Sequence, residues 1–133
     1  RVRIQPKVVE AGHHRRELRE LTGLLVEDGQ ARKLLNDLAA FTAHGGYENA
    51  DREWVARRWL ATVYTPIVEI LPDELRSKIA PAEYFHEVME HRWALSDEAG
   101  HEVDIFDSAR DYVATVLPHR PSDAPSGLGR PSG

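Results

Sequence analysis

Apolar side chains recur three or four positions apart along most of this chain. One stripe shows the pattern clearly, and its members are Ala31, Leu34, Leu35, Leu38 and Phe41. This spacing places the side chains on one face of an α-helix. The pattern therefore predicts an all-α fold, a single bundle of about five or six helices that occupies residues 13–117.

Glycines mark the ends of the first two expected helices. The first helix is expected over residues 13–22, before Gly23, and the second follows a turn at Asp28. Gly45 and Gly46 end the second helix, because glycine readily adopts the left-handed backbone that closes a helix.

The third expected helix contains a proline. Asn49 or Asp51 can cap its start, and Pro66 must break or kink it near Tyr64, since proline cannot donate a helical hydrogen bond. Residues 67–71 are expected to continue at an angle. The tryptophans of the chain are interpreted as core anchors: Trp54, Trp59 and Trp93.

Prolines and acids set the boundaries of the remaining helices. A short helix is expected over residues 72–79, and a longer one over residues 81–98, which Gly100 ends. The last helix begins at a cap supplied by Asp104 and stops at Pro118.

Both ends of the chain depart from the helical pattern. Residues 1–12 alternate apolar and polar positions, which predicts an extended arm or a strand whose partner lies upstream. Arg1 rather than methionine opens the sequence, so we expect a piece of a longer protein. Residues 118–133 are rich in Pro, Ser and Gly, which predicts a disordered tail.

The amino-acid composition is typical of a folded domain and excludes several other classes of protein. Of the 133 residues, 41% are hydrophobic and 29% charged, as in a folded domain, and the absence of cysteine excludes disulfides and cysteine metal sites. We find neither a run of about 18 apolar residues nor a secretory leader, and we expect a cytoplasmic protein without membrane contact. A net charge of -5 disfavours nucleic acid as a partner.

The helix expected over residues 81–98 carries a dense set of histidines and acids. His86 and His91 lie five positions apart and diverge by roughly 140°, so they cannot clamp one zinc ion as in zinc proteases. Glu83, His86 and Glu90 share a face and the spacing of di-metal bundles. They form a metal-ligand alternative to a solvated polar face.

Arg92 is expected on the apolar side of the same helix. A guanidinium in that position needs a carboxylate or carbonyl partner, since an unpaired buried charge is costly. Asp37, at the edge of the second helix stripe, is one candidate partner. The alternative is that the Arg92 side chain extends to solvent.

The segment from His13 to Arg16 holds four potentially cationic side chains at a helix start. Such a start also offers free backbone N–H donors, so this segment could bind an anion. Neighbouring glutamates oppose that interpretation and favour a structural or solvated role. Arg32 and Lys33 after a glycine turn suggest a DNA-reading helix, a pattern that helical domains often produce by chance.

Three stretches together resemble a known protein family. They are Val2 to His14, Gln30 to Asp37, and His86 with Glu87 followed by Glu90 to Trp93. They are similar to the C-terminal part of an uncharacterised actinobacterial family often labelled lipopolysaccharide-kinase-like. The resemblance covers most of residues 1–117 and implies a kinase-like domain upstream. The family pattern has asparagine where Gly29 stands, so the role of that side chain does not carry over.

These observations support two functions from different classes. The first is a non-catalytic accessory or interaction domain without a cofactor, docked on the kinase-like region of the same protein or on another protein. The second is a domain that binds a divalent metal or an anionic ligand, extending to a metal-dependent enzyme. The candidate partner- or ligand-binding residues are His13, His14, Arg15, Arg16, Gln30, Arg32, Asn36, Asp37, His91 and Arg92.

Overall fold

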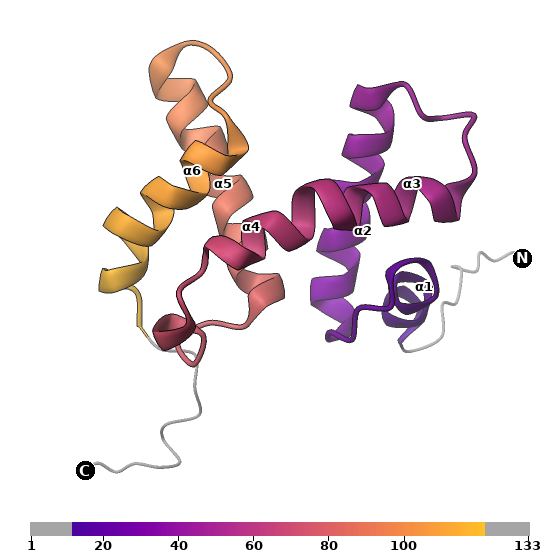
Figure 1. Ribbon diagram of the computed structural model, residues 1–133, viewed down its shortest axis with the longest axis horizontal. Coiled ribbons are helices and arrows are strands. Elements are labelled where there is room, and N and C mark those ends of the chain that lie inside the picture. Colours follow the sequence, from indigo (N-terminus) through magenta and orange to yellow (C-terminus); the bar gives the residue numbers. More distant parts are fainter. Residues whose placement is uncertain (1–11, 122–133) are drawn as a thin grey trace, which may run out of the picture. The chain divides into compact units, whose positions relative to one another are not determined.

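The computed structural model describes residues 12–121, and all regular structure in this range is helical (Figure 1). Six α-helices, α1 to α6, follow one another with short π-helical and 3₁₀-helical segments between or after them. The prediction of an all-α fold is confirmed. Residues 1–11 of the expected arm and residues 122–133 of the expected tail lie outside the described part.

The chain divides into two compact units, and the boundary in sequence falls between Leu60 and Ala61. Each unit encloses its own set of buried apolar side chains. The sequence pattern predicted one bundle over residues 13–117. It did not predict the division, because an apolar stripe shows that a helix is covered on one face but not which helix covers it.

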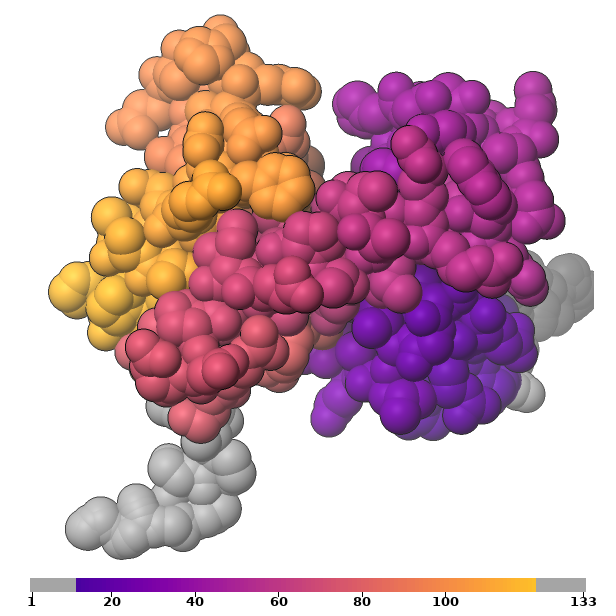
Figure 2. Space-filling view, in the orientation of Figure 1, coloured from indigo at the N-terminus to yellow at the C-terminus, as the bar shows by residue number. Residues whose placement is uncertain are grey.

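The first unit is built from α1 (His13–Thr22), α2 (Asp28–Gly45) and α3 (Arg52–Trp59). Helix α1 packs against both other helices. In the space-filling view the atoms of α1, in indigo, lie beside those of α2 and α3 (Figure 2). The buried apolar residues of this unit are Leu18, Leu21, Ala31, Leu34, Leu38, Val55, Ala56 and Trp59.

The ends of these helices follow local chemistry. Gly23 has φ of 81° and donates its N–H to the Arg19 carbonyl at 2.8 Å, so it closes α1 where the sequence predicted. The carboxylate of Asp51 accepts the Trp54 N–H at 3.0 Å and caps α3. The choice between Asn49 and Asp51 is therefore decided in favour of Asp51.

The second unit contains three α-helices and several short helical segments. Its elements are η1 (Leu60–Tyr64), which begins one residue before the boundary, α4 (Thr65–Ile70), η2 (Asp73–Leu75), α5 (Pro81–Ala99), α6 (Ile105–Asp111), η3 (Tyr112–Val116) and η4 (Leu117–His119). Helices α4, α5 and α6 pack against one another. The largest buried side chains include Tyr84, Phe85 and Tyr112, and the Tyr84 hydroxyl donates to the Ile67 carbonyl at 2.8 Å.

Two π-helical segments of this unit each precede a proline, Pro66 or Pro118. Segment η1 ends just before α4, which holds Pro66, and η3 ends just before η4, which holds Pro118. A proline ring clashes with the carbonyl four residues earlier, which lies inside the π segment in both cases. The wider π turn relieves this clash without ending the helical path. The predicted kink near Tyr64 thus takes the form of a π turn.

The helix expected over residues 72–79 is much shorter than predicted. Only Asp73–Leu75 form a 3₁₀ helix, and successive hydrogen bonds between residues three apart continue as turns to Lys78. These tight turns bring Ile79 into the core, where it is 1% exposed. Burial of this side chain outweighs the weak helix propensity of a short segment.

The interpretation of all three tryptophans as core anchors is wrong for two of them. Trp59 is 1% exposed and lies in the core of the first unit, as predicted. Trp54 is 46% exposed and Trp93 is 72% exposed. Both residues have apolar neighbours at helical spacing, which suggested burial. In the fold, however, α3 and α5 turn these two indoles towards solvent.

The folded chain continues beyond the predicted boundary at residue 117. Segment η4 carries the backbone through Pro118, and Arg120 contacts α5. Residues 118–121, which the sequence assigned to the tail, therefore belong to the second unit. In the described part of the chain, no helix is both long and apolar enough to cross a bilayer.

Asp104→Ala should destabilise the second unit by about 1 kcal/mol. The Asp104 carboxylate accepts the N–H groups of Phe106 and Asp107, both at 3.0 Å, and alanine leaves both donors without this acceptor. Urea denaturation followed by circular dichroism measures the change. The control is Asp97→Ala, an exposed acid within α5, for which we expect a change within about 0.5 kcal/mol. Equal losses in the two variants would contradict the capping role.

Candidate functional site

A carboxylate of the same chain binds the start of α1. Asp28, the first residue of α2, accepts the Arg15 N–H at 2.8 Å, and its other oxygen lies 3.4 Å from Nδ1 of His14. The backbone hydrogen bond from Arg15, followed by the contact with His14, holds the pKa of Asp28 below its usual value. This carboxylate lies at the helix start where the sequence offered an external anion as one of two interpretations, the other being a structural or solvated role.

Glu17 joins α1 to α3. Its carboxylate pairs with the Arg52 guanidinium and lies 3.7 Å from Nε2 of His13. His13 and His14 therefore face separate acids, Glu17 and Asp28, rather than one shared centre. The side chains of Arg15 and Arg16 are exposed.

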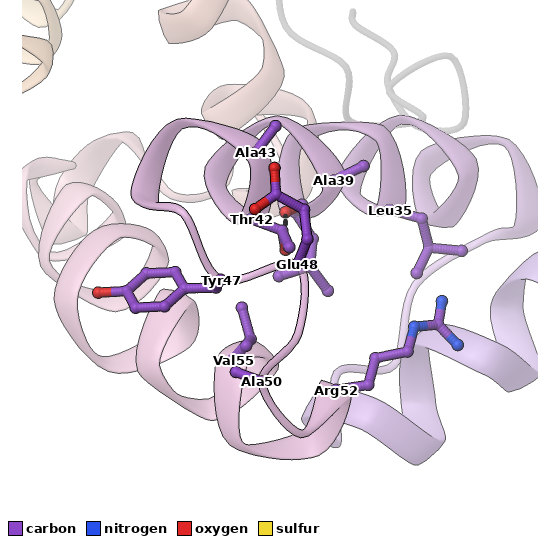
Figure 3. A pocket seen from close by; sticks show the side chains of 10 residues that line it. Leu35, Ala39, Thr42, Ala43, Tyr47, Glu48, Ala50, Arg52 and Val55 are labelled. Carbon is purple, nitrogen blue, oxygen red and sulfur yellow. Dashed lines mark hydrogen bonds between the residues drawn. The ribbon is translucent and has the colours of Figure 1, made fainter.

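A hollow of about 360 Å³ opens in the first unit (Figure 3). Its lining is mainly apolar and comes from α2, α3 and the segment between them: Leu35, Leu38, Ala39, Thr42, Ala43, Tyr47, Glu48, Ala50, Arg52 and Val55. The Tyr47 ring packs at one side against Phe41 and Trp54, with ring centres 5.6 and 5.5 Å apart.

The predicted site residues of α2 are spread around that helix. Arg32 and Asn36 are exposed, whereas Gln30 and Asp37 are half-buried. The hollow is lined by other residues of α2. None of the four side chains lines this hollow.

The histidines and acids of α5 separate into different contacts. His86 pairs with Glu90 at 3.1 Å, one turn along the same face, whereas His91 points to Asp111 of α6. The predicted divergence of His86 and His91 agrees with these contacts. Among the residues that the structure describes, no group of three or more histidines and acids gathers to hold a metal ion. The set Glu83, His86 and Glu90 does not form one.

A cluster that the sequence analysis missed lies on α5, around Glu87. Its carboxylate accepts the Tyr112 hydroxyl at 2.5 Å and two hydrogen bonds from Arg120, at 2.8 Å from Nε and 2.6 Å from Nη2. The side chains of Glu87 and Arg120 are 22% and 16% exposed. A paired guanidinium and carboxylate with this geometry is among the stronger contacts in proteins.

The surroundings of Glu87 have two opposing effects on the pKa of its carboxyl group. Burial raises the pKa of the carboxyl, but hydrogen bonds from Arg120 and Tyr112 and the charge of Arg120 outweigh burial and lower it below 4.5. Burial, and then the hydrogen bond and charge of Glu87, raise the pKa of Tyr112 well above its usual range. Near neutral pH the cluster therefore consists of a carboxylate, a neutral phenol and a guanidinium.

His91 and Arg92 bind the chain that follows α5. Nε2 of His91 lies 2.7 Å from a carboxylate oxygen of Asp111, and the imidazole packs edge-on against Tyr112. Nε of Arg92 donates to the Val103 carbonyl at 2.7 Å, and Nη2 lies 3.5 Å from Glu102. The expected carbonyl or carboxylate partner of Arg92 is confirmed. It is local, whereas Asp37 belongs to the other unit.

The two exposed tryptophans have different surroundings. The Arg58 guanidinium lies 5.5 Å from the ring centre of Trp54, and Tyr47 meets that ring edge-on. No cation or aromatic ring among residues 12–121 covers Trp93 in this way. Within residues 61–121, Trp93 is therefore the large apolar side chain that remains exposed.

Comparison with known proteins gives one match. The sequence profile of a family described as a domain of unknown function (DUF4032) matches residues 1–117. No curated protein and no solved structure is similar to the chain at a significant level.

Arg120→Ala should destabilise the second unit by about 2 kcal/mol, because Glu87 loses two charged hydrogen bonds in a partly buried place. A chain that ends after residue 117 should lose at least as much, whereas a chain that ends after residue 121 should keep its stability. Thermal and urea denaturation test the series. The control is Arg110→Ala, whose exposed pair with Asp107 should contribute less than about 0.5 kcal/mol.

Glu87→Gln should change the acid limb of the stability profile. Since the pKa of Glu87 is lowered on folding, its contribution is complete above its ordinary value of 4.5 and disappears as pH falls through the folded value. As pH falls below the ordinary pKa of Glu87, the free energy of unfolding of the wild-type chain should therefore decrease more steeply than that of the variant. Urea midpoints over a pH series measure this difference, and Glu98→Gln, an exposed acid, should leave the slope unchanged.

Proposed function

The chain belongs to the family described as a domain of unknown function (DUF4032), and we propose that it acts as a non-catalytic interaction domain. Its partner is a kinase-like domain of the same protein or of another protein. The resemblance of three sequence stretches to a kinase-like family supports this choice of partner. We propose that the protein acts in the cytoplasm, and a chain without cysteine is compatible with that reducing compartment.

The exposed indole of Trp93 carries this proposal. It is 72% exposed in the second half of a regular helix of 19 residues, where a polar residue would serve the fold equally well. Tryptophan is enriched at the centres of protein interfaces, because its large ring loses contact with water when a partner binds. A regular helix that presents such a ring is a suitable docking element.

The contacts of the polar side chains described above support a structural role for them. Glu87, His91 and Arg92 bind the segments after α5, and His14 is paired with Asp28. A catalytic acid or base needs access to a substrate proton, whereas these groups are directed at partners within the fold. They order the helices and leave the exposed side of α5 that carries Trp93 for a partner.

Isothermal titration calorimetry of this chain against the purified kinase-like domain tests the proposal. We expect binding, and we expect Trp93→Ala to weaken it about tenfold, which is the usual loss at a central interface residue. Leu25→Ala is the matched control, because Leu25 is 76% exposed but lies in the other unit. Absence of binding to the kinase-like domain, or nucleotide hydrolysis by this chain alone, would contradict the proposal.

A further inference from the structure

The outer face of α5 combines the indole of Trp93 with acidic side chains. Glu90 lies three positions before Trp93 and Asp97 four positions after it, so all three share one helix face. Both acids are exposed, and the Glu90 side chain is 64% exposed despite its pair with His86. We call Glu90, Trp93 and Asp97 the outer face of α5.

The charge near this face is predominantly negative. Glu98, at the end of α5, and Glu102, in the segment before α6, are also exposed. Arg92 is the nearest cation in sequence, but its guanidinium is directed at Val103 and Glu102. A partner segment that covers Trp93 must therefore accept acidic neighbours, which favours a basic segment and disfavours phosphate-rich surfaces.

The first unit shows which contact an indole of this chain can make. The Arg58 guanidinium, 5.5 Å from the ring centre, covers the face of Trp54. A cation over an indole is attracted by the negative face of the ring, and a planar guanidinium also stacks on it. Trp93 offers an indole with the same chemistry, together with two exposed carboxylates that a guanidinium can bind.

We infer that the outer face of α5 binds a basic, arginine-bearing segment of the partner. One guanidinium lies on the indole of Trp93 and pairs with Glu90 or Asp97. This inference rests on the proposed interaction function and adds the chemistry of the partner. Arginine is preferred over lysine, because only the planar guanidinium can stack on the ring and bind a carboxylate through two parallel hydrogen bonds.

Nuclear magnetic resonance with a synthetic arginine-rich peptide tests the inference. The three indole N–H signals of the ¹⁵N-labelled chain report on Trp54, Trp59 and Trp93 separately, and Trp93→Phe assigns the third. We expect the Trp93 signal to move on titration while the other two remain in place. The same peptide with citrulline in place of arginine keeps the shape but removes the charge, and it should bind at least about tenfold more weakly.

Matched variants distinguish peptide binding at the outer face of α5 from attraction of the peptide by the overall negative charge of the chain. Trp93→Ala, and Glu90→Gln combined with Asp97→Asn, should each weaken peptide binding about five- to tenfold. Glu53→Gln combined with Glu74→Gln removes two exposed acids elsewhere and should change binding less than about twofold. Circular dichroism of each variant confirms that it folds, which is expected because all of these side chains are exposed.

The outcomes distinguish this inference from the proposed function. Equal losses in both pairs of acid variants, or movement of the Trp54 signal instead of the Trp93 signal, would overturn the inference. Self-association of the chain that Trp93→Ala abolishes would also overturn it, because a second copy would then be the occupant. If the kinase-like domain binds but its affinity is insensitive to Trp93→Ala, the inference fails and the proposed function stands. If the peptide binds as expected but the kinase-like domain does not, the proposed function fails.

Discussion

Polar contacts between one side of α5 and the chain that follows it determine which surface the second unit presents. Glu87 accepts hydrogen bonds from η3 and from Arg120. His91 contacts α6, and Arg92 donates a hydrogen bond to the segment before α6. These contacts add to the burial of Tyr84, Phe85 and Val88, and together they orient α5 about its own axis. Because that side of the helix faces inward, the opposite side, with Trp93, faces outward.

Pro66 and Pro118 impose a second constraint on the same unit. Each follows a five-residue π segment, η1 before Pro66 and η3 before Pro118. The π turn makes room for the proline ring while the backbone continues as a helix. In η3 this widening also places Tyr112 in the core, where its hydroxyl reaches Glu87. The helical path after α6 therefore supplies both members of the cluster around Glu87.

The site was only partly predictable, for reasons that differ among residues. The need of Arg92 for a partner follows from its helical position, but the partner is a carbonyl in a turn, which has no sequence signal. Glu87 and Arg120 lie 33 positions apart, and no local pattern connects them. The position of Glu87 between Phe85 and Val88, both buried, was the available sign that its charge needed a partner. The helix start at His13 suggested that an anion could bind there. In the fold, the carboxylate of Asp28 from the same chain binds this helix start.

The sequence by itself determined the helical class and most helix boundaries of this protein. Glycines with positive φ, capping acids and prolines act on their immediate neighbours, so Gly23, Gly100 and Asp104 could be recognised without a structure. Only the tertiary structure decided the division into two units, the outward rotation of Trp54 and Trp93, and the partners of the buried charges. These features depend on contacts between residues far apart in the chain, and an apolar stripe specifies that a face is covered without specifying by what.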